Sequence, residues 1–205
     1  MPDLTPAQRS NFLPVTAWGY AWWRAHSLSL LSGEPFSLTR EACLFQAICA
    51  PQAEQHWLDA GTSAGFYAGV LARAGCRVTA ADLSTTMLRV AAQRERAPLI
   101  AWERVNIEQN GWPDGSFDGV KVGATLNETA HPDVFLHQLE RVLKPGGHLW
   151  LMFVPATGGL GQRGLSRLGG LFFPDPSWVE RHLPRCTLVH AFRVGRVQFM
   201  ALVRS

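Results

Sequence analysis

The stretch from His56 to Gly75 constrains this chain more than any other. It begins with an apolar run that ends at Asp59, turns at Gly61 and Gly65, and continues into Ala- and Leu-rich sequence with helical spacing. This order predicts a strand, a tight loop and a helix. Glycine lets the backbone approach a ligand, and the first helical turn presents free N–H groups to a carboxylate or phosphate. The stretch therefore predicts a ligand-binding loop, although an ordinary strand-to-helix connection has the same outline.

A second β-prone run, residues 76–83, makes the interpretation more specific. It ends at Asp82, 23 positions after Asp59. In an open parallel sheet, the acid at the end of the second strand accepts hydrogen bonds from the ribose hydroxyls of a bound nucleoside. Dinucleotide-binding loops carry the order G-x-G-x-x-G, whereas the order from Asp59 to Gly65 is D-x-G-x-S-x-G. The sequence therefore predicts a nucleoside ligand and argues against a nicotinamide dinucleotide.

Three motifs, in order along the chain, resemble those of one enzyme family. The loop is similar to the D-x-G-x-G-x-G loop of class I S-adenosylmethionine (SAM)-dependent methyltransferases, with Ser63 in place of the middle glycine. The segment ending at Asp118 aligns without a gap with the pattern G-D-A-E-x-L-P-F-P-D-G-S-F-D of the type 11, small-molecule methyltransferases. The sequence from Lys144 to Gly147 resembles that family's L-K-P-G-G turn. The resemblance to this UbiE-like family extends over residues 56–154.

The resemblance implies an α/β fold, a Rossmann-like seven-stranded, mostly parallel sheet with helices on both faces and a C-terminal antiparallel strand pair. A length of 205 residues with 47% hydrophobic content suits one such domain, residues 1–205. Residues 1–50 are expected to form an N-terminal helical cap, and the Gly-rich residues 155–174 a cover rather than a rigid long helix. The expected strands are 56–60, 76–82, 99–105, 117–123, 144–154 and a pair around Gly195. The expected helices are 15–31, 37–50, 64–74, 85–96, 133–143 and 176–183.

The resemblance also implies which residues hold S-adenosyl-L-methionine. The glycine loop suits its methionine tail, the acid after the second strand suits its ribose, and residues after the second and third strands suit its adenine. The expected cofactor-binding residues are Asp59, Gly61, Thr62, Ser63, Gly65, Asp82, Leu83, Met87, Asn106, Ile107, Gly123 and Ala124.

Three residues depart from the expected pattern. If Ser63 needs a left-handed backbone, serine costs about 1–2 kcal/mol relative to glycine; if the glycine serves ligand contact instead, the Ser63 side chain would partly block the tail pocket. Asn106 stands where the family usually has Asp, and its carboxamide oxygen can still accept a hydrogen bond from the adenine amino group. Lys121 lies in a β-rich run, where it either snorkels from a strand end or reaches the site.

The acceptor side is less determined by the sequence. Asn127, Glu128 and His131 follow the fourth strand, and His131 is the predicted general base, with an ordinary solvated histidine as the alternative. Tyr20 and Trp22 belong to an aromatic N-terminal helix and, with Asn127 and Glu128, are the predicted acceptor-binding residues. These aromatic residues favour a small hydrophobic or ring-bearing acceptor.

Composition limits the remaining possibilities. No stretch is long and apolar enough for a membrane span, and the N-terminus lacks a secretory signal, so a cytoplasmic protein is expected, with peripheral membrane contact left open. The four cysteines lack metal-binding spacing, so neither a metal nor a disulfide is predicted. Residues 151–205 contain seven arginines and two acids, a net charge of +5. An RNA methyltransferase using this basic quarter and a catalytically silent SAM-binding regulator remain as alternatives, although no nucleic-acid module is visible.

Overall fold

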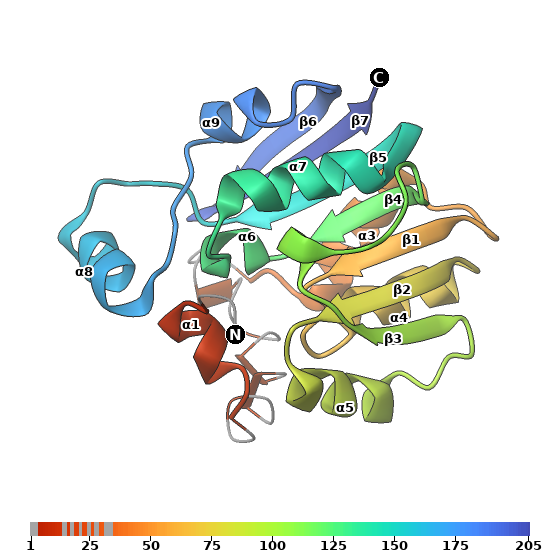
Figure 1. Cartoon of the computed structure of the whole chain (residues 1–205), viewed down its shortest axis with the longest axis horizontal. Coiled ribbons are helices and arrows are strands. Elements are labelled where there is room, and N and C mark those ends of the chain that lie inside the picture. The colour runs from red at the N-terminus through yellow and green to blue at the C-terminus, as the bar shows by residue number, and fades with distance from the viewer. Residues whose placement is uncertain are drawn as a thin grey trace.

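The centre of the molecule is a seven-stranded sheet with the strand order β3-β2-β1-β4-β5-β7-β6 (Figure 1). The computed structural model describes residues 4–13, 16, 19–20, 22–23, 26, 29–30 and 35–205. Strands β1 to β5 are parallel, and β7 runs antiparallel to both β5 and β6. The Rossmann-like fold with a C-terminal antiparallel pair, expected from the sequence, is confirmed.

Outside the region 15–31, the expected strands and helices occur in the predicted order with small shifts at their ends, and four further helices, residues 6–10, 107–109, 125–128 and 160–169, were not predicted. The strands are β1 (His56–Ala60), β2 (Arg77–Asp82), β3 (Ile100–Arg104), β4 (Phe117–Val122), β5 (Leu143–Phe153), β6 (Cys186–Val194) and β7 (Val197–Arg204). The described helices are α1 (Pro6–Ser10), α3 (Leu38–Cys49), α4 (Phe66–Arg73), α5 (Thr85–Arg94), the short 3-10 helix η1 (Ile107–Gln109), α6 (Thr125–Glu128), α7 (Pro132–Val142), α8 (Leu160–Gly169) and α9 (Pro176–Arg181).

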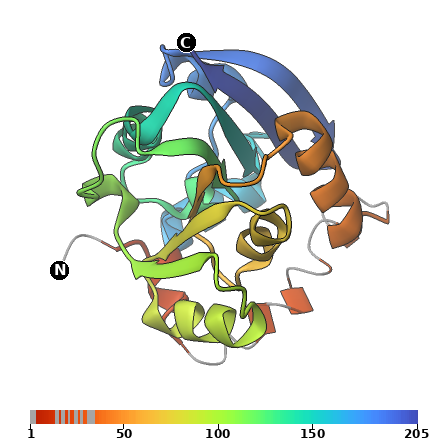
Figure 2. The same ribbon diagram turned by 90° about the vertical axis from the view of Figure 1, so that its right-hand side faces the viewer.

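Both faces of the sheet are buried, because helices cover each side. Helices α7 and α9 pack on one face, while α3 and α4 pack on the other (Figures 1 and 2). Strand β1 shows the consequence: Trp57 points into one apolar cluster and Leu58 into the other, and both are fully buried. Such two-sided burial is typical of parallel sheets and explains why β1 reads as a continuous apolar run.

Side-chain caps set the starts of three helices where the sequence predicted them. The hydroxyl of Ser84 accepts a hydrogen bond from the Met87 N–H at 3.2 Å, and the hydroxyl of Ser37 accepts one from the Arg40 N–H. Asp175 caps α9 by accepting from the Ser177 N–H. Each cap satisfies a backbone donor that the first helical turn leaves without a partner.

One segment differs from the expectation, and another lies largely outside the described residues. The Gly-rich segment contains the ten-residue helix α8, which ends at Gly170 in the left-handed conformation (φ 65°). Glycine therefore did not prevent a helix here, because leucines and arginines recur at helical spacing between the glycines. The expected helix 15–31 falls largely outside the described residues, Trp18 included, although Tyr20, Trp22 and Trp23 have helical backbone.

Candidate active site

The site lies beyond the carboxyl ends of β1, β2 and β4, where the strand order reverses. Ligands of open α/β sheets bind at this place. The loop after β1 is anchored because the N–H groups of Gly61 and Thr62 both donate to the Ala81 carbonyl at 2.9 Å. Ser63 has a left-handed backbone (φ 50°), which settles the first alternative raised for this residue: the position favours glycine for its conformation. A side chain at Gly61 would collide with Thr125, so this glycine is also required for space.

A buried ion pair supports the loop from below. Asp59 is fully buried and accepts hydrogen bonds from the Thr62 hydroxyl at 2.6 Å and from the Ala68 N–H at 3.0 Å. The Lys121 Nζ lies 3.2 Å from the Asp59 carboxylate and 4.2 Å from the centre of the Tyr67 ring. Lys121 thus reaches the site from β4 rather than snorkelling to solvent. The pair fixes the loop, since an unpaired buried charge would be strongly destabilising.

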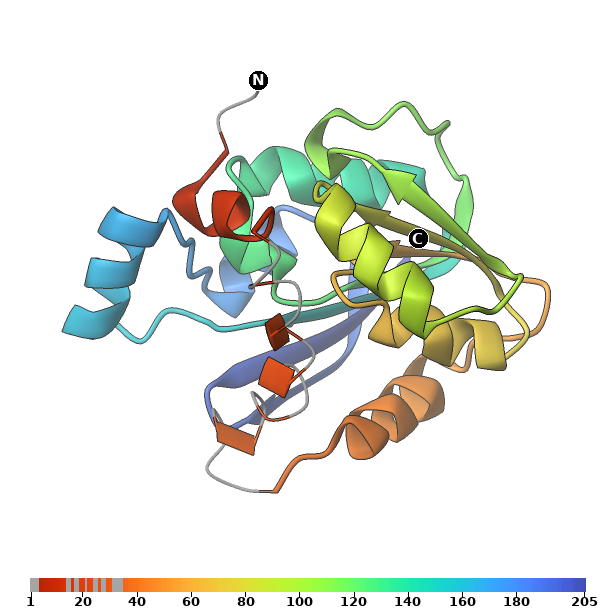
Figure 3. The same cartoon turned by 90° about the horizontal axis from the view of Figure 1, so that it is seen from below.

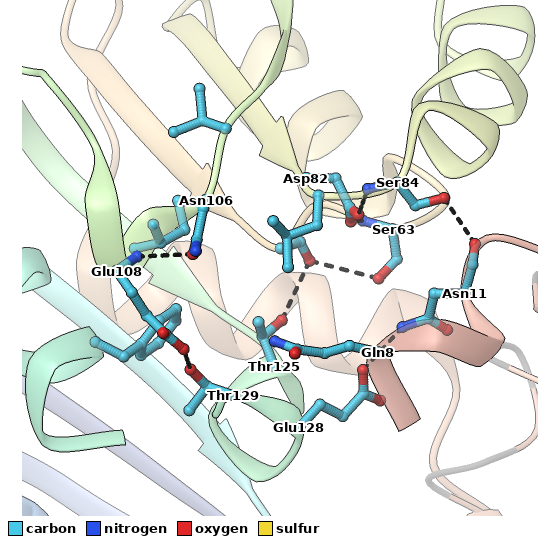
Figure 4. Close-up of a pocket in the computed structure, with 15 residues that line it drawn as sticks. Gln8, Asn11, Ser63, Asp82, Ser84, Asn106, Glu108, Thr125, Glu128 and Thr129 are labelled. Carbon is cyan, nitrogen blue, oxygen red and sulfur yellow. Dashed lines mark hydrogen bonds between the residues drawn. The ribbon is translucent and has the colours of Figure 1, made fainter. Parts of the chain in front are cut away.

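The first cavity, called here the Asp82 cavity, has a polar wall (Figure 4). The two carboxylate oxygens of Asp82 accept hydrogen bonds from the N–H groups of Ser63 at 2.9 Å and Ser84 at 2.8 Å. Burial raises the pKa of Asp82 to about 6, although these two backbone donors pull it down. The cavity is lined by Gln8, Asn11, Gly61, Ser63, Asp82, Leu83, Ser84, Val105, Asn106, Ile107, Glu108, Thr125, Glu128, Thr129 and Phe135.

Glu108 was missed by the sequence analysis, although it fixes one side of this cavity. Its carboxylate accepts hydrogen bonds from the Thr129 hydroxyl and from the N–H groups of Ala130 at 3.0 Å and His131 at 3.2 Å. Asn106 caps the same turn by accepting from the Glu108 N–H at 3.1 Å. The available signal was the glutamate of the motif G-D-A-E, with which Glu108 aligns.

Residues 5–11 of the N-terminal segment close the opposite side of the Asp82 cavity; a helical cap was expected from residues 1–50, but not a helix at residues 6–10 in this place. Helix α1 begins with a capping box in which Thr5 and Gln8 satisfy each other's backbone N–H groups. The Asn11 side chain donates to the Glu128 carboxylate at 2.9 Å, and the Ser84 hydroxyl donates to the Asn11 carbonyl at 2.7 Å (Figure 4). The pattern Thr-Pro-x-Gln was the sequence signal for the helix, but nothing local indicated its partner.

Glu128 occupies the most central position among the acceptor-side residues. It lines the Asp82 cavity and also a larger cavity described below. The pKa of Glu128 is raised to about 7: burial is the main cause and the neighbouring Asp82 carboxylate adds to it, while the hydrogen bond from Asn11 opposes the shift. A carboxyl group with such a pKa exchanges protons near neutral pH, which suits a general base.

The second cavity, called here the Lys121 cavity, adjoins the first on the other side of the glycine loop. It is lined by Tyr20, Gly61, Thr62, Ser63, Ala64, Phe66, Tyr67, Lys121, Gly123, Ala124, Thr125 and Met152. Gly61, Ser63 and Thr125 belong to both cavities. A single elongated ligand could therefore extend from one to the other past Thr125.

The third cavity, called here the apolar cavity, opens beside Glu128 and is lined mainly by aliphatic and aromatic side chains. Asn127 fixes its wall, because the side-chain amide donates to the carbonyls of Val154 and Phe172 at 2.8 Å and its oxygen accepts from the Val154 N–H at 2.9 Å. The lining residues are Tyr20, Trp23, Ala124, Asn127, Glu128, Met152, Phe153, Val154, Thr157, Gln162, Leu165, Leu171, Phe173, Arg196 and Val197.

The structure brings together most, but not all, of the residues named from the sequence. Those lining a cavity are Gly61, Thr62, Ser63, Asp82, Leu83, Asn106, Ile107, Gly123, Ala124, Tyr20, Asn127 and Glu128. Asp59, Gly65 and Met87 lie behind the cavity walls; Gly65 faces Trp102 and Ala91, and Met87 is buried. His131 and Trp22 are exposed and line none of these three cavities, so the geometry favours Glu128 over His131 as the base.

Among the described residues, no three His, Cys, Asp or Glu side chains gather where they could hold a metal ion. None of the helices in the described part of the chain has the length and apolar character needed to cross a membrane.

The fold and the loop after β1 define a class I methyltransferase-like domain, and sequence comparison gives its family. Residues 58–151 match the family model described as a methyltransferase domain. The ubiquinone/menaquinone biosynthesis C-methyltransferase UbiE of Rubrivivax gelatinosus is 36% identical over 103 residues, which are 50% of this chain and 41% of that protein. The chain therefore matches less than half the length of such curated relatives.

Solved structures extend the similarity to the fold of nearly the whole chain. The phosphoethanolamine N-methyltransferase 2 of Haemonchus contortus, solved with S-adenosylhomocysteine, superposes with a TM-score of 0.76 and 15% identity over 97% of this chain and 59% of that one. The [4+2]-cyclase SpnF superposes with a TM-score of 0.74 and 16% identity over 100% of this chain and 98% of that one. Identities this low establish the fold alone, and a cyclase among these structures illustrates that the fold does not determine the reaction.

Proposed function

We propose that this protein is a SAM-dependent methyltransferase that acts on a small, hydrophobic or ring-bearing acceptor, such as a quinone-type ring. One observation carries the proposal: the polar Asp82 cavity and the apolar cavity meet at Glu128. A methyl donor held on one side would then face an acceptor on the other, with an acid–base group at the junction. The activity of the UbiE-type relatives agrees with this assignment.

The residues present fit the donor in three places. The Asp82 carboxylate, already held by two backbone N–H groups, keeps free lone pairs for the ribose hydroxyls. Leu83 and Ile107 would take the two faces of the adenine, with Asn106 at its edge. The Lys121 ammonium would attract the carboxylate of the methionine tail, and the carbonyl groups around Gly61 and Gly123 would accept from its ammonium.

The bound donor supplies an electrophilic methyl group on a sulfonium, and the protein supplies orientation and proton transfer. Proximity and alignment of the two reactants account for much of the acceleration of such displacements. Glu128 would accept the proton that an acceptor hydroxyl or activated ring carbon loses. Asn127 would keep the wall of the apolar cavity in register by tying Val154 to Phe172.

The domain organisation supports closure of the site during the reaction. We propose one domain over residues 1–205, with the N-terminal segment and residues 155–174 covering the apolar cavity. The hydrogen bond from the Phe172 N–H to the Asn127 carbonyl at 2.8 Å gives that cover a fixed hinge. Hydrogen exchange in residues 156–173 should slow when cofactor and acceptor are both bound; equal exchange in the ternary complex would exclude the cover.

Calorimetry with SAM, S-adenosylhomocysteine and NAD, side by side, tests the cofactor assignment. Micromolar binding of the two adenosyl ligands without binding of NAD is the expected result, and preferential NAD binding would overturn the proposal. Incubation with labelled SAM and a panel of soluble quinol analogues then tests methyl transfer. Binding without transfer to any ring-bearing acceptor would favour the silent regulator.

A further inference from the structure

Helix α8 stands apart from the body of the molecule and carries an unusual surface. It lies at the far left of Figure 1 and again at the far left of Figure 3, away from the sheet. None of its ten residues is buried. Leu160 is 83% exposed and Leu168 is 84% exposed. A single exposed leucine would be ordinary, but several on one short helix form an apolar patch of the kind that marks an interaction site.

The residues of α8 are arranged in two sectors. With 3.6 residues per turn, Leu160, Leu165 and Leu168 fall on one side of the helix, and Arg163 and Arg167 fall on the neighbouring side. No acidic residue occurs between Glu140 and Asp175. This combination of a leucine sector beside arginines, in a helix without acids, is typical of helices that lie in the interface of an anionic bilayer.

The leucine sector continues into the apolar cavity. Leu165 belongs to the sector and also lines the cavity. Trp23 and Arg196, both exposed, line the same cavity from the N-terminal segment and from the β6–β7 connection. The rim thus combines an aromatic ring, leucines and arginines, which suit the boundary between acyl chains and phosphate groups.

We propose that α8 and this rim dock on an anionic phospholipid surface, so that the apolar cavity opens toward the bilayer. The leucines enter the boundary of the acyl chains, and Arg163, Arg167 and Arg196 contact lipid phosphates. A lipophilic molecule dissolved in the bilayer would then reach the cavity without crossing water. This proposal rests on the surface of α8 and does not depend on the cofactor assignment.

Vesicle sedimentation tests the docking with the full chain. Wild-type protein should sediment with vesicles of phosphatidylcholine and phosphatidylglycerol in equal amounts, and much less with phosphatidylcholine alone. The double variant Leu160→Ser/Leu168→Ser should lower the bound fraction on the anionic vesicles on the order of tenfold or more. Arg163→Gln/Arg167→Gln should weaken binding about fivefold per charge.

Matched controls come from the opposite part of the molecule. Leu99, 40% exposed before β3, and the exposed Arg89 and Arg94 on α5 lie away from α8 (Figure 1). The variants Leu99→Ser and Arg89→Gln/Arg94→Gln should bind vesicles as wild type does. Equal melting temperatures and equal S-adenosylhomocysteine affinity in the α8 variants would exclude misfolding as the cause of lost binding.

The result that overturns the proposal is equally specific. Wild type that stays in the supernatant with anionic vesicles, or α8 variants that sediment like wild type, would exclude membrane docking. A wild-type dimer in gel filtration that the Leu160→Ser/Leu168→Ser variant converts to a monomer would assign the surface to a second copy instead. A protein that sediments with vesicles but binds no adenosyl ligand would refute the proposed function and leave the docking intact.

Discussion

The Asp82 cavity and the apolar cavity meet at one residue but are built in different ways. The key contacts of the first come from backbone groups in short loops: the N–H groups of Ser63 and Ser84 hold the carboxylate of Asp82, and the Ala81 carbonyl holds the glycine loop. The apolar cavity is assembled from side chains of four separate chain segments. These are the N-terminal region, α6, β5 with the α8 segment, and the β6–β7 connection. A site built from backbone groups can keep its ligand when side chains are replaced. A site built from side chains changes its ligand preference when those side chains are replaced. We therefore propose that the Asp82 cavity binds the cofactor and that the apolar cavity selects the acceptor.

The sharpest test of this division is Asp82→Ala. Two hydrogen bonds from ribose hydroxyls to a charged acceptor contribute about 1.5–3 kcal/mol each, so affinity for S-adenosylhomocysteine should fall by about 3–6 kcal/mol. Calorimetry measures the loss. Asp114→Ala, which removes an exposed carboxylate paired with Arg141, is the control and should bind normally. An Asp82→Ala affinity within threefold of wild type would move the ribose elsewhere.

Glu128→Gln tests the junction between the two regions. The amide retains an acceptor for Asn11 but cannot take a proton, so kcat should fall about 10²- to 10⁴-fold while cofactor affinity changes only a few-fold. In wild type, activity should decline as pH falls through about 7, where Glu128 becomes protonated. His131→Ala is the contrasting variant, since that side chain is exposed. Full activity of Glu128→Gln together with loss in His131→Ala would restore His131 as the base.

The same variant gives a stability readout with a defined sign. A carboxyl whose pKa is raised in the folded state costs stability as pH rises from its unfolded value, near 4.5, to about 7. Relative to wild type, Glu128→Gln should therefore become more stable between pH 5 and 8, by about 1–3 kcal/mol. Denaturant unfolding of the two proteins at each pH measures this difference, to which the charge of the neighbouring Asp82 carboxylate contributes. A constant difference would mean that Glu128 titrates normally.

In the Asp82 cavity the sequence predicted the loop after β1 and the strand ends, but not Glu108 or Asn11, whose side chains close two of its sides. The strand ends at Asp59 and Asp82, the caps at Ser37 and Ser84 and the closing strand pair all follow from local patterns of apolar residues, turns and acids. The motif shows that glycine is usual at the position of Ser63 but not why. A left-handed backbone was therefore one of two alternatives, and close contact with the ligand was the other.

The remaining features depend on contacts that no local pattern encodes. The hydrogen bond from Asn11 to Glu128 joins residues 117 positions apart. The burial that raises the pKa of Glu128 is likewise a product of the fold and not of the local sequence. The pairing of Lys121 with Asp59 could be foreseen only by knowing that β4 lies beside β1. The α8 helix was missed because glycine frequency outweighed the spacing of its leucines and arginines.

Lys121 offers a test within the cofactor region itself. If its ammonium holds the tail carboxylate, Lys121→Gln should weaken S-adenosylhomocysteine by about 1.5–3 kcal/mol, the range for hydrogen bonds to charged groups. 5′-Methylthioadenosine, which lacks the amino-acid tail, reports the part of the loss that comes from the unpaired Asp59, and its affinity should fall less than that of S-adenosylhomocysteine. Lys144→Gln, which breaks the more exposed pair with Asp118, controls for net charge. Equal losses for both ligands would mean that Lys121 supports the loop through Asp59 without contacting the tail.

The smallest expected effect is the pH dependence of cofactor binding, which distinguishes Asp82 from Glu128. In the free protein the pKa of Asp82 is about 6, so below that pH the carboxyl becomes neutral and a poorer acceptor for the ribose hydroxyls. Binding should therefore be full at pH 7 and weaken as pH falls, by about tenfold at pH 5. Calorimetry with S-adenosylhomocysteine across this range provides the measurement, and it should be repeated in Glu128→Gln. Because Glu128, with a pKa of about 7, is already mostly protonated where Asp82 titrates, the variant should show the same decline at the same pH. A decline centred near pH 7 that disappears in Glu128→Gln would instead assign the dependence to Glu128 and join the two regions into one titrating unit.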